Sequence, residues 1–504
     1  MRAISAEAGS LDGMRSRILR GLAWKAGSQL ILQCTRIIVA LILARLLTPR
    51  DYGLVGMVLV FSSIALVFQD LALGAGLVQR QEISEKDRST VFWTSAAVGV
   101  VLSAVGFVIS APLAALYREP AVQPLFAVLS VSFLIGALGT TQAALLRREM
   151  NFRGLELRVI AGTLASAAVG ITAAVRGFGP WAIIGQQLTY AAVSTALLWV
   201  FSPWRPKLVY SLASLRDLGG FGINLLGTRL LFALRRNSDN LLVGRFLGSA
   251  ALGAYTVAFN IMLIPLSRLV FPLQEVLYPA LSRMQDDPQR VAAVWLRVTR
   301  LVAAVSVPAL LGMAVVAPDF VPVVLGDRWR AAVPVIQILT WVGILQSLAS
   351  LNSQILPALD RATTLLKYTI VSFLFSLVGF AVGLHWGIIG VATGYALAAT
   401  LFIPLYTWVT ARAVGTSALA FARSLSGVVQ ASLVMLVCVW GARLVLIHEH
   451  VTPGARLAIV SLLGLAVFLA CCRWRAPEVL IEIRSVRRAR RRDTALPAGS
   501  LSEG

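Results

Sequence analysis

Polar side chains at helical spacing interrupt two apolar segments of this 504-residue chain. The first segment carries four of them at spacings of four, four and three, namely Lys25, Gln29, Gln33 and Arg36. A later segment carries three at spacings of seven and four, namely Arg229, Arg236 and Asn240. Such spacings place each set on one face of a helix. Because guanidinium groups grip phosphate oxygens in bidentate fashion, the two faces predict a cationic cavity that binds a phosphate-containing ligand.

An internal repeat of 200 residues relates the two polar faces. Residues 36–53 and 236–253 share five identities, more than the roughly one or two expected by chance. The identical pairs are Arg36 and Arg236, Leu41 and Leu241, Arg45 and Arg245, Leu47 and Leu247, and Gly53 and Gly253. Two copies that face the same way across a membrane predict two parallel, pseudo-symmetric lobes.

Acidic residues deep in the apolar segments are few, namely Asp70, Asp239, Glu275 and Asp360. Asp239 is the candidate for coupling to a cation, although its arginine neighbours disfavour proton carriage. An alternative interpretation is that Arg235 and Asp239 neutralise each other while Lys25 extends to the membrane surface. For Arg45 and Arg245 we expect a structural role, because each lies at the end of its helix, where a positive charge interacts favourably with the helix dipole.

The composition is that of a polytopic membrane protein. Hydrophobic residues make up 58% of the chain and charged residues 13%, and the mean hydropathy is +0.80. Apolar runs of about 20 residues recur from end to end, and each can cross a bilayer as a helix. Fourteen spans are expected, at 22–47, 52–79, 89–111, 121–146, 157–176, 179–201, 217–247, 250–281, 296–317, 331–358, 363–384, 387–411, 424–447 and 455–473.

The repeat divides these spans into an all-α fold of two six-helix lobes and two extra C-terminal helices. The expected divisions are an N-terminal tail (1–20), an N-lobe (21–205), a C-lobe (206–415), spans thirteen and fourteen (416–475) and a basic tail (476–504). Pro265, Pro272 and Pro308 lie inside expected spans, where proline favours a kink.

The net charge of +22 has two explanations, nucleic-acid binding and the positive-inside rule. The positions favour the second, because Arg and Lys gather in both tails and in alternate loops. Both tails are therefore expected in the cytoplasm, and no nucleic acid is expected as a partner. The weakest point of this assignment is the loop between spans thirteen and fourteen, which Arg443 and Arg456 flank.

The sequence does not predict a cofactor, a metal site or an enzyme. There is no phosphate-binding glycine-rich loop, and the four cysteines lack the spacing of a zinc or redox pair. The cluster His448, Glu449 and His450 is interpreted as a polar turn, and no loop is long enough to hold a catalytic domain.

Five stretches carry a resemblance to a known family. They are LARLLTPRDYGLVGM (43–57), FQDLALGAGLVQRQ (68–81), LLRREMNFRGL (145–155), RRNSDNLLVGRFLGSAALGAYTVAFNI (235–261) and YPALSRMQDD (278–287). With them the chain resembles the polysaccharide transporter family of the multidrug/oligosaccharidyl-lipid/polysaccharide exporter superfamily, especially its exopolysaccharide and colanic-acid-like branch. The resemblance covers roughly residues 18–420.

The resemblance implies a flippase in the bacterial inner membrane. It would move an oligosaccharide repeat unit linked to undecaprenyl pyrophosphate from the cytoplasmic to the periplasmic leaflet by alternating access, for exopolysaccharide or lipopolysaccharide synthesis. Implied partners are membrane lipids, the lipid-linked oligosaccharide, a polysaccharide polymerase and chain-length or export proteins.

Four alternatives remain beside this function. Two lie in the same superfamily, an ion-coupled multidrug exporter and the flippase of the peptidoglycan lipid precursor. The others are a membrane polysaccharide polymerase, which should carry large periplasmic loops, and a scaffold protein that transports nothing.

Overall fold

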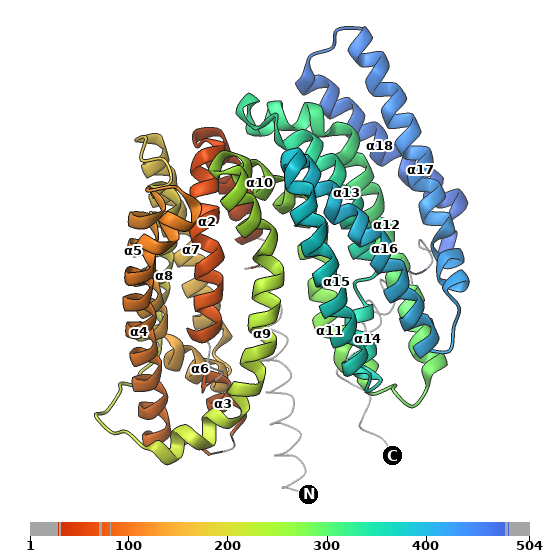
Figure 1. The fold of residues 1–504 in the computed structure, drawn as a ribbon. Coiled ribbons are helices and arrows are strands. Elements are labelled where there is room, and N and C mark those ends of the chain that lie inside the picture. The colour runs from red at the N-terminus through yellow and green to blue at the C-terminus, as the bar shows by residue number, and fades with distance from the viewer. Residues whose placement is uncertain (1–28, 30–31, 70–72, 81, 479–481, 483–504) are drawn as a thin grey trace, which may run out of the picture. The chain divides into compact units, whose positions relative to one another are not determined.

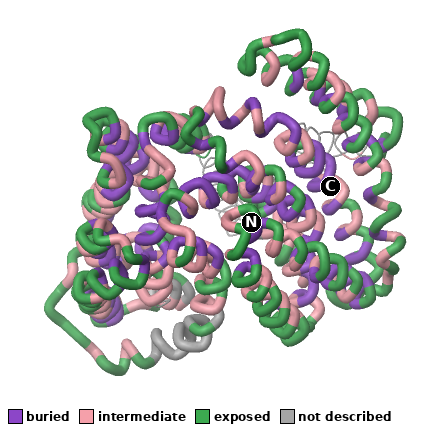
Figure 2. Tube along the Cα trace, turned by 45° about the horizontal axis from the view of Figure 1, so that its top comes forward, coloured by how far each residue is buried: buried purple, intermediate pink, exposed green. Residues whose placement is uncertain are grey.

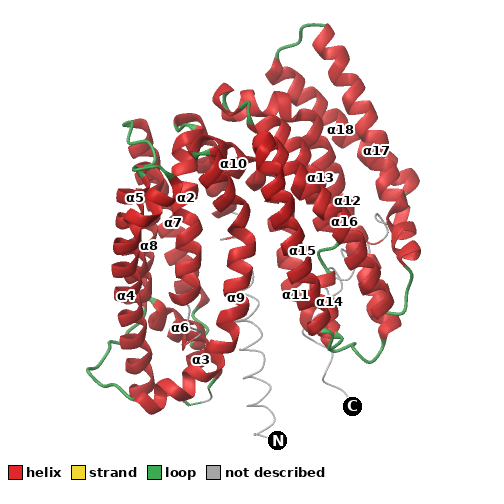
Figure 3. Ribbon diagram, in the orientation of Figure 1, coloured by secondary structure: helices red, strands yellow, loops and turns green. Residues whose placement is uncertain are grey.

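The computed structural model describes residues 29, 32–69, 73–80, 82–478 and 482. Within these residues every regular element is a helix, and no strand occurs (Figure 3). The chain divides into two compact units, unit 1 over Met1–Ala254 and unit 2 over Tyr255–Gly504. The prediction of an all-α, polytopic membrane protein is confirmed. The lobe boundary expected between residues 205 and 206 stays a prediction.

The expected count of fourteen spans is not confirmed. Eleven stretches of the described residues are long and apolar enough to cross a membrane. One of them, Ala362–Ala413, holds two helices that pack against each other, α15 (Ala362–Gly383) and α16 (Gly387–Ala413). The eleven do not include the helix at 32–46, of which the described part is too short to be counted, or α9 (Leu212–Leu247), which carries charged residues along its length.

Unit 1 is a bundle of helices around α5. Its elements are the helix 32–46, α2 (Pro49–Gln69), α3 (Leu73–Gln79), α4 (Glu85–Tyr117), α5 (Val122–Ala137), α6 (Thr140–Arg148), α7 (Phe152–Val175), α8 (Trp181–Phe201), α9 and the start of α10 (Ser249–Pro265). α5 packs against α4, α2 and α8, α7 packs along α8, and α9 packs against α2 and α4 (Figure 1). The α5 side chains Leu125, Phe126 and Phe133 are each 1% exposed, so they form the centre of the unit.

The turn between helix 32–46 and α2 lies where the first expected span (22–47) ends and the second (52–79) begins. The first helix ends at Leu46, and α2 begins at Pro49, where the missing N–H of proline is tolerated. The Thr48 hydroxyl accepts a hydrogen bond from Asp51 N at 3.2 Å, and Asp51 Oδ2 accepts one from Thr48 N at 2.8 Å. This reciprocal pair is a capping box, which satisfies two N–H groups at the start of α2.

Gly53 and Gly253, one of the identical pairs of the repeat, lie in a reciprocal backbone contact. A Cβ on Gly53 would lie 1.6 Å from the carbonyl oxygen of Ser249, and a Cβ on Gly253 would lie 1.8 Å from that of Pro49. Pro49 and Ser249 are themselves related by the 200-residue repeat. Only glycine lets the backbones of α2 and α10 approach this closely, as small residues do between membrane helices.

Unit 2 contains the rest of α10 and the following elements. They are η1 (Leu266–Val270), α11 (Phe271–Ser282), α12 (Pro288–Phe320), η2 (Val321–Leu325), η3 (Asp327–Trp329), α13 (Ala332–Leu348), α14 (Asn352–Ala358), α15, η4 (Leu384–Trp386), α16, α17 (Ala418–His448) and α18 (Pro453–Arg475). α12 packs against α13, α17 and α18, and α13 also packs against α16. Trp295 of α12 is fully buried and stacks on Phe421 of α17, with ring centroids 4.8 Å apart.

Three expected spans are not single α-helices. Spans four and ten become the helix pairs α5 and α6, and α13 and α14, whereas span eight becomes α10, the π-helical turn η1 and α11. The connection between α2 and α3, in span two, lies outside the described residues. The π-helical turn directly follows Pro265, which cannot donate the regular backbone hydrogen bond. Each of these breaks lies inside a stretch whose apolar content over its full length fits one span. Spans four and ten are equivalent positions of the repeat.

Many large apolar side chains are exposed on the described helices. Figure 2 shows long runs of exposed residues along the helices. Among the large apolar side chains, Phe107, Val200 and Leu462 are 68%, 72% and 69% exposed. A water-soluble protein rarely presents contiguous apolar surface of this extent, whereas a lipid-facing helix requires it.

Candidate functional site

The first predicted polar face lies on the helix at 32–46. Lys25 lies outside the described residues. Gln29 and Arg36 are exposed, and Gln33 is half-buried. An arginine inside an apolar helix is costly in hydrocarbon, so the exposed guanidinium of Arg36 requires water or an anionic partner.

The second predicted polar face lies on α9. Ser211 caps the start of this helix, since its hydroxyl accepts a hydrogen bond from Ser214 N. Asn237 Nδ2 donates to Ser63 Oγ of α2 at 2.9 Å, which fixes the rotation of α9 about its own axis. With that rotation Arg236 is exposed, and Arg229 and Asn240 are half-buried.

Asp239 is buried beside the second face, with 5% of its surface exposed. Its Oδ1 accepts a hydrogen bond from Asn240 N at 2.8 Å. The Asn240 side-chain oxygen is buried and accepts no hydrogen bond from the described residues. The two oxygens are hard ligands of the kind that a small cation prefers, and the coupling role of Asp239 stays a prediction.

Arg229 lines a polar pocket inside unit 1, which we call the arginine pocket. The pocket has a volume of about 740 Å³ and is formed by α2, α3, α5, α6, α7, α8 and α9. Its principal polar lining residues are Arg147, Arg158, Arg229, Gln69, Gln187 and Ser194. No acidic residue of the part of the chain that the structure describes lines it. This arrangement can bind an anionic ligand that also carries hydroxyl groups.

The sequence analysis did not identify Arg147 and Arg158 as site residues, because it interpreted both as positive charges of a cytoplasmic loop. The break between α5 and α6 places Arg147 at the end of a short helix that packs against α7. Arg158 lies between one and two turns after the start of α7. Its Nη1 donates a hydrogen bond to Ser194 Oγ of α8 at 3.0 Å. Arg158 lies inside the expected span 157–176, where arginine is rare, and this position could have identified it as a site residue.

The next arginine along α6 has a different role. Arg148 Nη1 donates to the carbonyl oxygen of Leu77 at 3.1 Å and to that of Arg80. These carbonyls lie at the end of α3, where a helix has no internal donors for them. Arg148 therefore joins α6 to α3, whereas its neighbour Arg147 lines the pocket.

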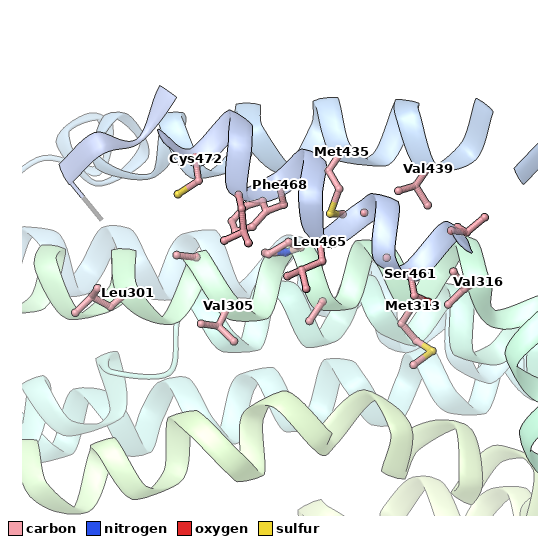
Figure 4. A pocket seen from close by; sticks show the side chains of 17 residues that line it. Leu301, Val305, Met313, Val316, Met435, Val439, Ser461, Leu465, Phe468 and Cys472 are labelled. Atoms are coloured by element: carbon pink, nitrogen blue, oxygen red, sulfur yellow. The ribbon is translucent and has the colours of Figure 1, made fainter. Parts of the chain in front are cut away.

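Unit 2 holds an apolar pocket of about 560 Å³ between α12, α17 and α18. Figure 4 shows Leu301, Val305 and Met313 along one wall, with Phe468 and Leu465 facing them. Ser461 is the only one of its lining residues with a polar side chain other than cysteine. The lining suits a hydrocarbon chain and offers almost nothing to a polar group.

A buried ion cluster ties α17 and α18 to α12. Arg443 Nε donates to Asp319 Oδ2 at 2.6 Å, and Arg456 Nε donates to Asp319 Oδ1 at 2.8 Å. The Asp319 side chain is 3% exposed. Sequence reasoning did not single out Asp319, so Arg443 and Arg456 counted as loop charges, although each has a carboxylate partner.

Comparison with known proteins identifies sequence relatives over most of the chain. Residues 42–334 match the family described as polysaccharide biosynthesis protein. The lipopolysaccharide biosynthesis protein WzxC of Escherichia coli is 29% identical, with 76% of this chain and 79% of WzxC covered. The teichuronic acid biosynthesis protein TuaB of Bacillus subtilis is 27% identical, with 91% and 96% covered. The succinoglycan biosynthesis transport protein ExoT of Rhizobium meliloti is 26% identical, with 64% and 65% covered.

Two solved structures share the fold. The lipid II flippase MurJ in an inward closed conformation matches with a TM-score of 0.73 at 14% identity, covering 90% of this chain and 99% of MurJ. An inward-facing multidrug resistance transporter of the MATE family matches with a TM-score of 0.58 at 14% identity, covering 77% and 96%. At these identities the likeness concerns the fold alone.

Proposed function

Since this chain belongs to the family of polysaccharide biosynthesis proteins, we propose that it is the flippase of an oligosaccharide repeat unit linked to undecaprenyl pyrophosphate. It moves this unit from the cytoplasmic to the periplasmic leaflet of the bacterial inner membrane, with both termini in the cytoplasm. No bond is made or broken, so the protein is a transporter and not an enzyme.

The observation that carries the proposal is the arginine pocket. Among the described residues three arginines and no acidic residue line it, which supports an anion over a cation. A multidrug exporter for cationic compounds requires the opposite charge. The apolar pocket of unit 2 supports the same proposal, since a substrate with a polyprenyl tail needs hydrocarbon contacts that a water-soluble drug does not.

Arg36 and Arg236 are assigned to the pyrophosphate in this proposal. Both are exposed, both lie in helices interrupted by polar residues, and the repeat pairs them. Gln29, Gln33 and Asn240 add amide groups that can bind sugar hydroxyls. Alternating access exposes these groups to each leaflet in turn, with Asp239 as the residue that couples the change to a cation gradient.

The repeat unit then passes to a polysaccharide polymerase and to chain-length or export proteins, which are the proposed partners. These proteins act on the periplasmic side, where the polymer grows. Membrane lipids occupy the apolar faces described above.

The test is deletion of the gene followed by complementation, with lipid-linked sugar measured separately on each leaflet. Repeat units that accumulate facing the cytoplasm in the deletant, and disappear on complementation, support the proposal. Normal flipping with unpolymerised units outside would refute it in favour of a polymerase. Accumulation of the peptidoglycan precursor instead would assign the second flippase function.

A further inference from the structure

The segment 203–211 joins α8 to α9 without regular secondary structure, and it is held against the first turns of α4. We call it the linker strap. Trp204 Nε1 donates a hydrogen bond to Glu85 Oε1 at 3.0 Å, and Lys207 Nζ lies 3.6 Å from Glu85 Oε2. Figure 1 shows the segment at the same end of unit 1 as the start of α4. Because α4 is long and apolar enough to span a membrane, the linker strap lies near a membrane surface.

Side chains of α4 hydrogen-bond the backbone of the linker strap. Lys207 N donates to Ser89 Oγ at 3.2 Å, and the Lys207 carbonyl oxygen accepts from Trp93 Nε1 at 2.9 Å. Ser211 N donates to Thr90 Oγ1 at 3.0 Å. Water satisfies the backbone groups of an ordinary loop, whereas a segment that enters a bilayer needs partners within the protein. These contacts allow the linker strap to lie partly within the membrane surface.

The outer side of the linker strap is apolar. Leu208 is 91% exposed, the largest fraction among the large apolar side chains of the described residues, and Leu212, directly after the strap, is 64% exposed. Tyr210 and Trp93 are exposed beside them. Tyrosine and tryptophan gather where headgroups meet hydrocarbon, because each has an apolar ring with a polar tip. This surface therefore fits the boundary between lipid headgroups and acyl chains.

A groove of about 520 Å³ runs along α4 beside the linker strap. Its lining extends from Trp93 to Leu102 and includes Phe68 of α2 and Tyr210 of the strap. The hydroxyl groups of Thr94 and Tyr210 lie 3.3 Å apart at one end. Nine helical residues correspond to about 13 Å, which is close to half of the roughly 30 Å of hydrocarbon in a bilayer. The groove therefore has the length of an acyl chain in one leaflet.

Two lysines lie beyond the end of the groove that is nearer the start of α4. Lys86 is exposed and precedes Trp93 by seven residues, so the two share a face of α4. The side chain of Lys207 is 66% exposed, and it shares the Glu85 carboxylate with Arg88. Exposed lysines at a membrane surface attract anionic lipid headgroups. Apolar groove and positive charge thus follow each other in the order of an acyl chain and its phosphate.

We propose that the linker strap and α4 form a binding site for one anionic phospholipid, with an acyl chain in the groove and the phosphate at Lys86 and Lys207. The depth agrees with this assignment. α4 has 33 residues and is about 50 Å long, so roughly 10 Å extends beyond the hydrocarbon at each end. Trp93 lies about 12 Å after Glu85, so the groove begins where hydrocarbon begins. The bound lipid holds the strap, and with it the start of α9, against α4.

The test measures lipid contact at Leu208 in the purified full-length protein in nanodiscs. Leu208→Cys carries a bimane fluorophore, and the four native cysteines Cys34, Cys438, Cys471 and Cys472 are replaced by alanine. Quenching by phosphatidylglycerol with a nitroxide on its acyl chain is compared with quenching by equally labelled phosphatidylcholine. One lysine near an anionic headgroup contributes about fivefold in affinity. With two lysines we expect phosphatidylglycerol to bind here roughly tenfold or more tightly than phosphatidylcholine.

Variants in this background separate the headgroup from the acyl chain. Lys86→Gln and Lys207→Gln should each reduce the preference for phosphatidylglycerol about fivefold. Lys367→Gln is the matched control, because Lys367 is an exposed lysine of α15 in unit 2. Ala97→Phe fills the groove and should weaken both lipids, whereas Val100→Phe, at an exposed residue of α4 that does not line the groove, should weaken neither. All variants are compared at equal unfolding temperature.

Four results would overturn the proposal. Equal quenching by the two lipids would mean that the site has no headgroup preference, and a wild-type preference in both glutamine variants would place the anion elsewhere. Strong quenching by iodide in water, with none by either lipid, would place the linker strap in water. Protection from iodide and from both lipids would assign the surface to a second copy of the chain. The measurement requires no transport, so its failure leaves the flippase proposal intact.

Discussion

The contact between Gly53 and Gly253 predicts that a single methyl group destabilises the protein. In Gly253→Ala the added Cβ would lie 1.8 Å from the carbonyl oxygen of Pro49, whereas real Cβ atoms essentially never come within 3.0 Å. The backbones of α2 and α10 must therefore separate by roughly 1.2 Å, and overpacking of this kind costs about 1–3 kcal/mol. The equivalent change Gly53→Ala meets Ser249 at 1.6 Å and should cost at least as much.

The separation also strains a polar contact at the same place. Glu119 Oε1 accepts a hydrogen bond from Ser249 Oγ at 2.6 Å, and its Oε2 accepts one from Arg50 Nη2 at 3.2 Å. Movement of α10 by more than an ångström breaks the first of these, which adds about 1.5 kcal/mol or more because the acceptor is charged. The total is about 3 kcal/mol, or a fall of roughly 5–10 °C in unfolding temperature for a unit of this size.

The assay is thermal unfolding of the purified protein in detergent, with Gly441→Ala as the control. Gly441 lies inside α17 with nothing within 4 Å of an added Cβ. Alanine there should be neutral or stabilise the protein by about 0.5–1 kcal/mol, since glycine weakens a helix interior. If Gly253→Ala unfolds at the temperature of Gly441→Ala, the close approach of α2 and α10 does not exist.

The double variant tests the reciprocity of the contact. Gly53→Ala and Gly253→Ala push the same two backbones apart, so the second change meets a gap that the first has opened. The combined cost should therefore be clearly smaller than the sum of the two single costs. Additive costs would mean that the two glycines sit in independent environments, against the structure.

The remaining predictions concern charge. Asp319→Asn leaves two buried arginines without a carboxylate and should destabilise unit 2 by about 3–5 kcal/mol in thermal unfolding, whereas Asp327→Asn, at an exposed pair, should change it by less than about 1 kcal/mol. Equal effects would remove the structural role of the cluster. Arg36→Ala and Arg236→Ala should each reduce complementation of a deletant at unchanged membrane abundance, and full activity of the double variant would refute their assignment to the pyrophosphate.

Helix positions were largely predictable because they depend on local properties of the chain. The expected span 455–473 corresponds to α18 (Pro453–Arg475), and the hairpin before α2 follows from a capping box that four consecutive residues contain. The breaks inside spans four, eight and ten were not predictable from hydropathy. Each lies in a stretch that is long and apolar enough as a whole to count as one membrane span.

The arginine pocket escaped prediction for a related reason. Helical periodicity reports which residues share a face of one helix, and it relates Arg229 to Arg236, two turns apart. It does not report which other helices that face meets. Arg147 and Arg158 reach the pocket only because α6 is separate from α5, so the same break that hydropathy cannot detect also assembles the site.

The ion cluster of Asp319, Arg443 and Arg456 shows that the positions of charged residues along the chain do not reveal which residues they contact. The positive-inside rule counts Arg443 and Arg456 by position along the chain, and position alone assigns both to a loop at the wrong face. The single carboxylate of Asp319 neutralises one of their two charges within unit 2, so they carry less weight in deciding orientation. An arginine in a membrane protein therefore informs topology only after its partners are known, and the same holds for its use as evidence of a ligand. By that criterion Arg158, whose hydrogen bond within the described residues goes to a neutral hydroxyl, differs from Arg443 and Arg456, which share a carboxylate.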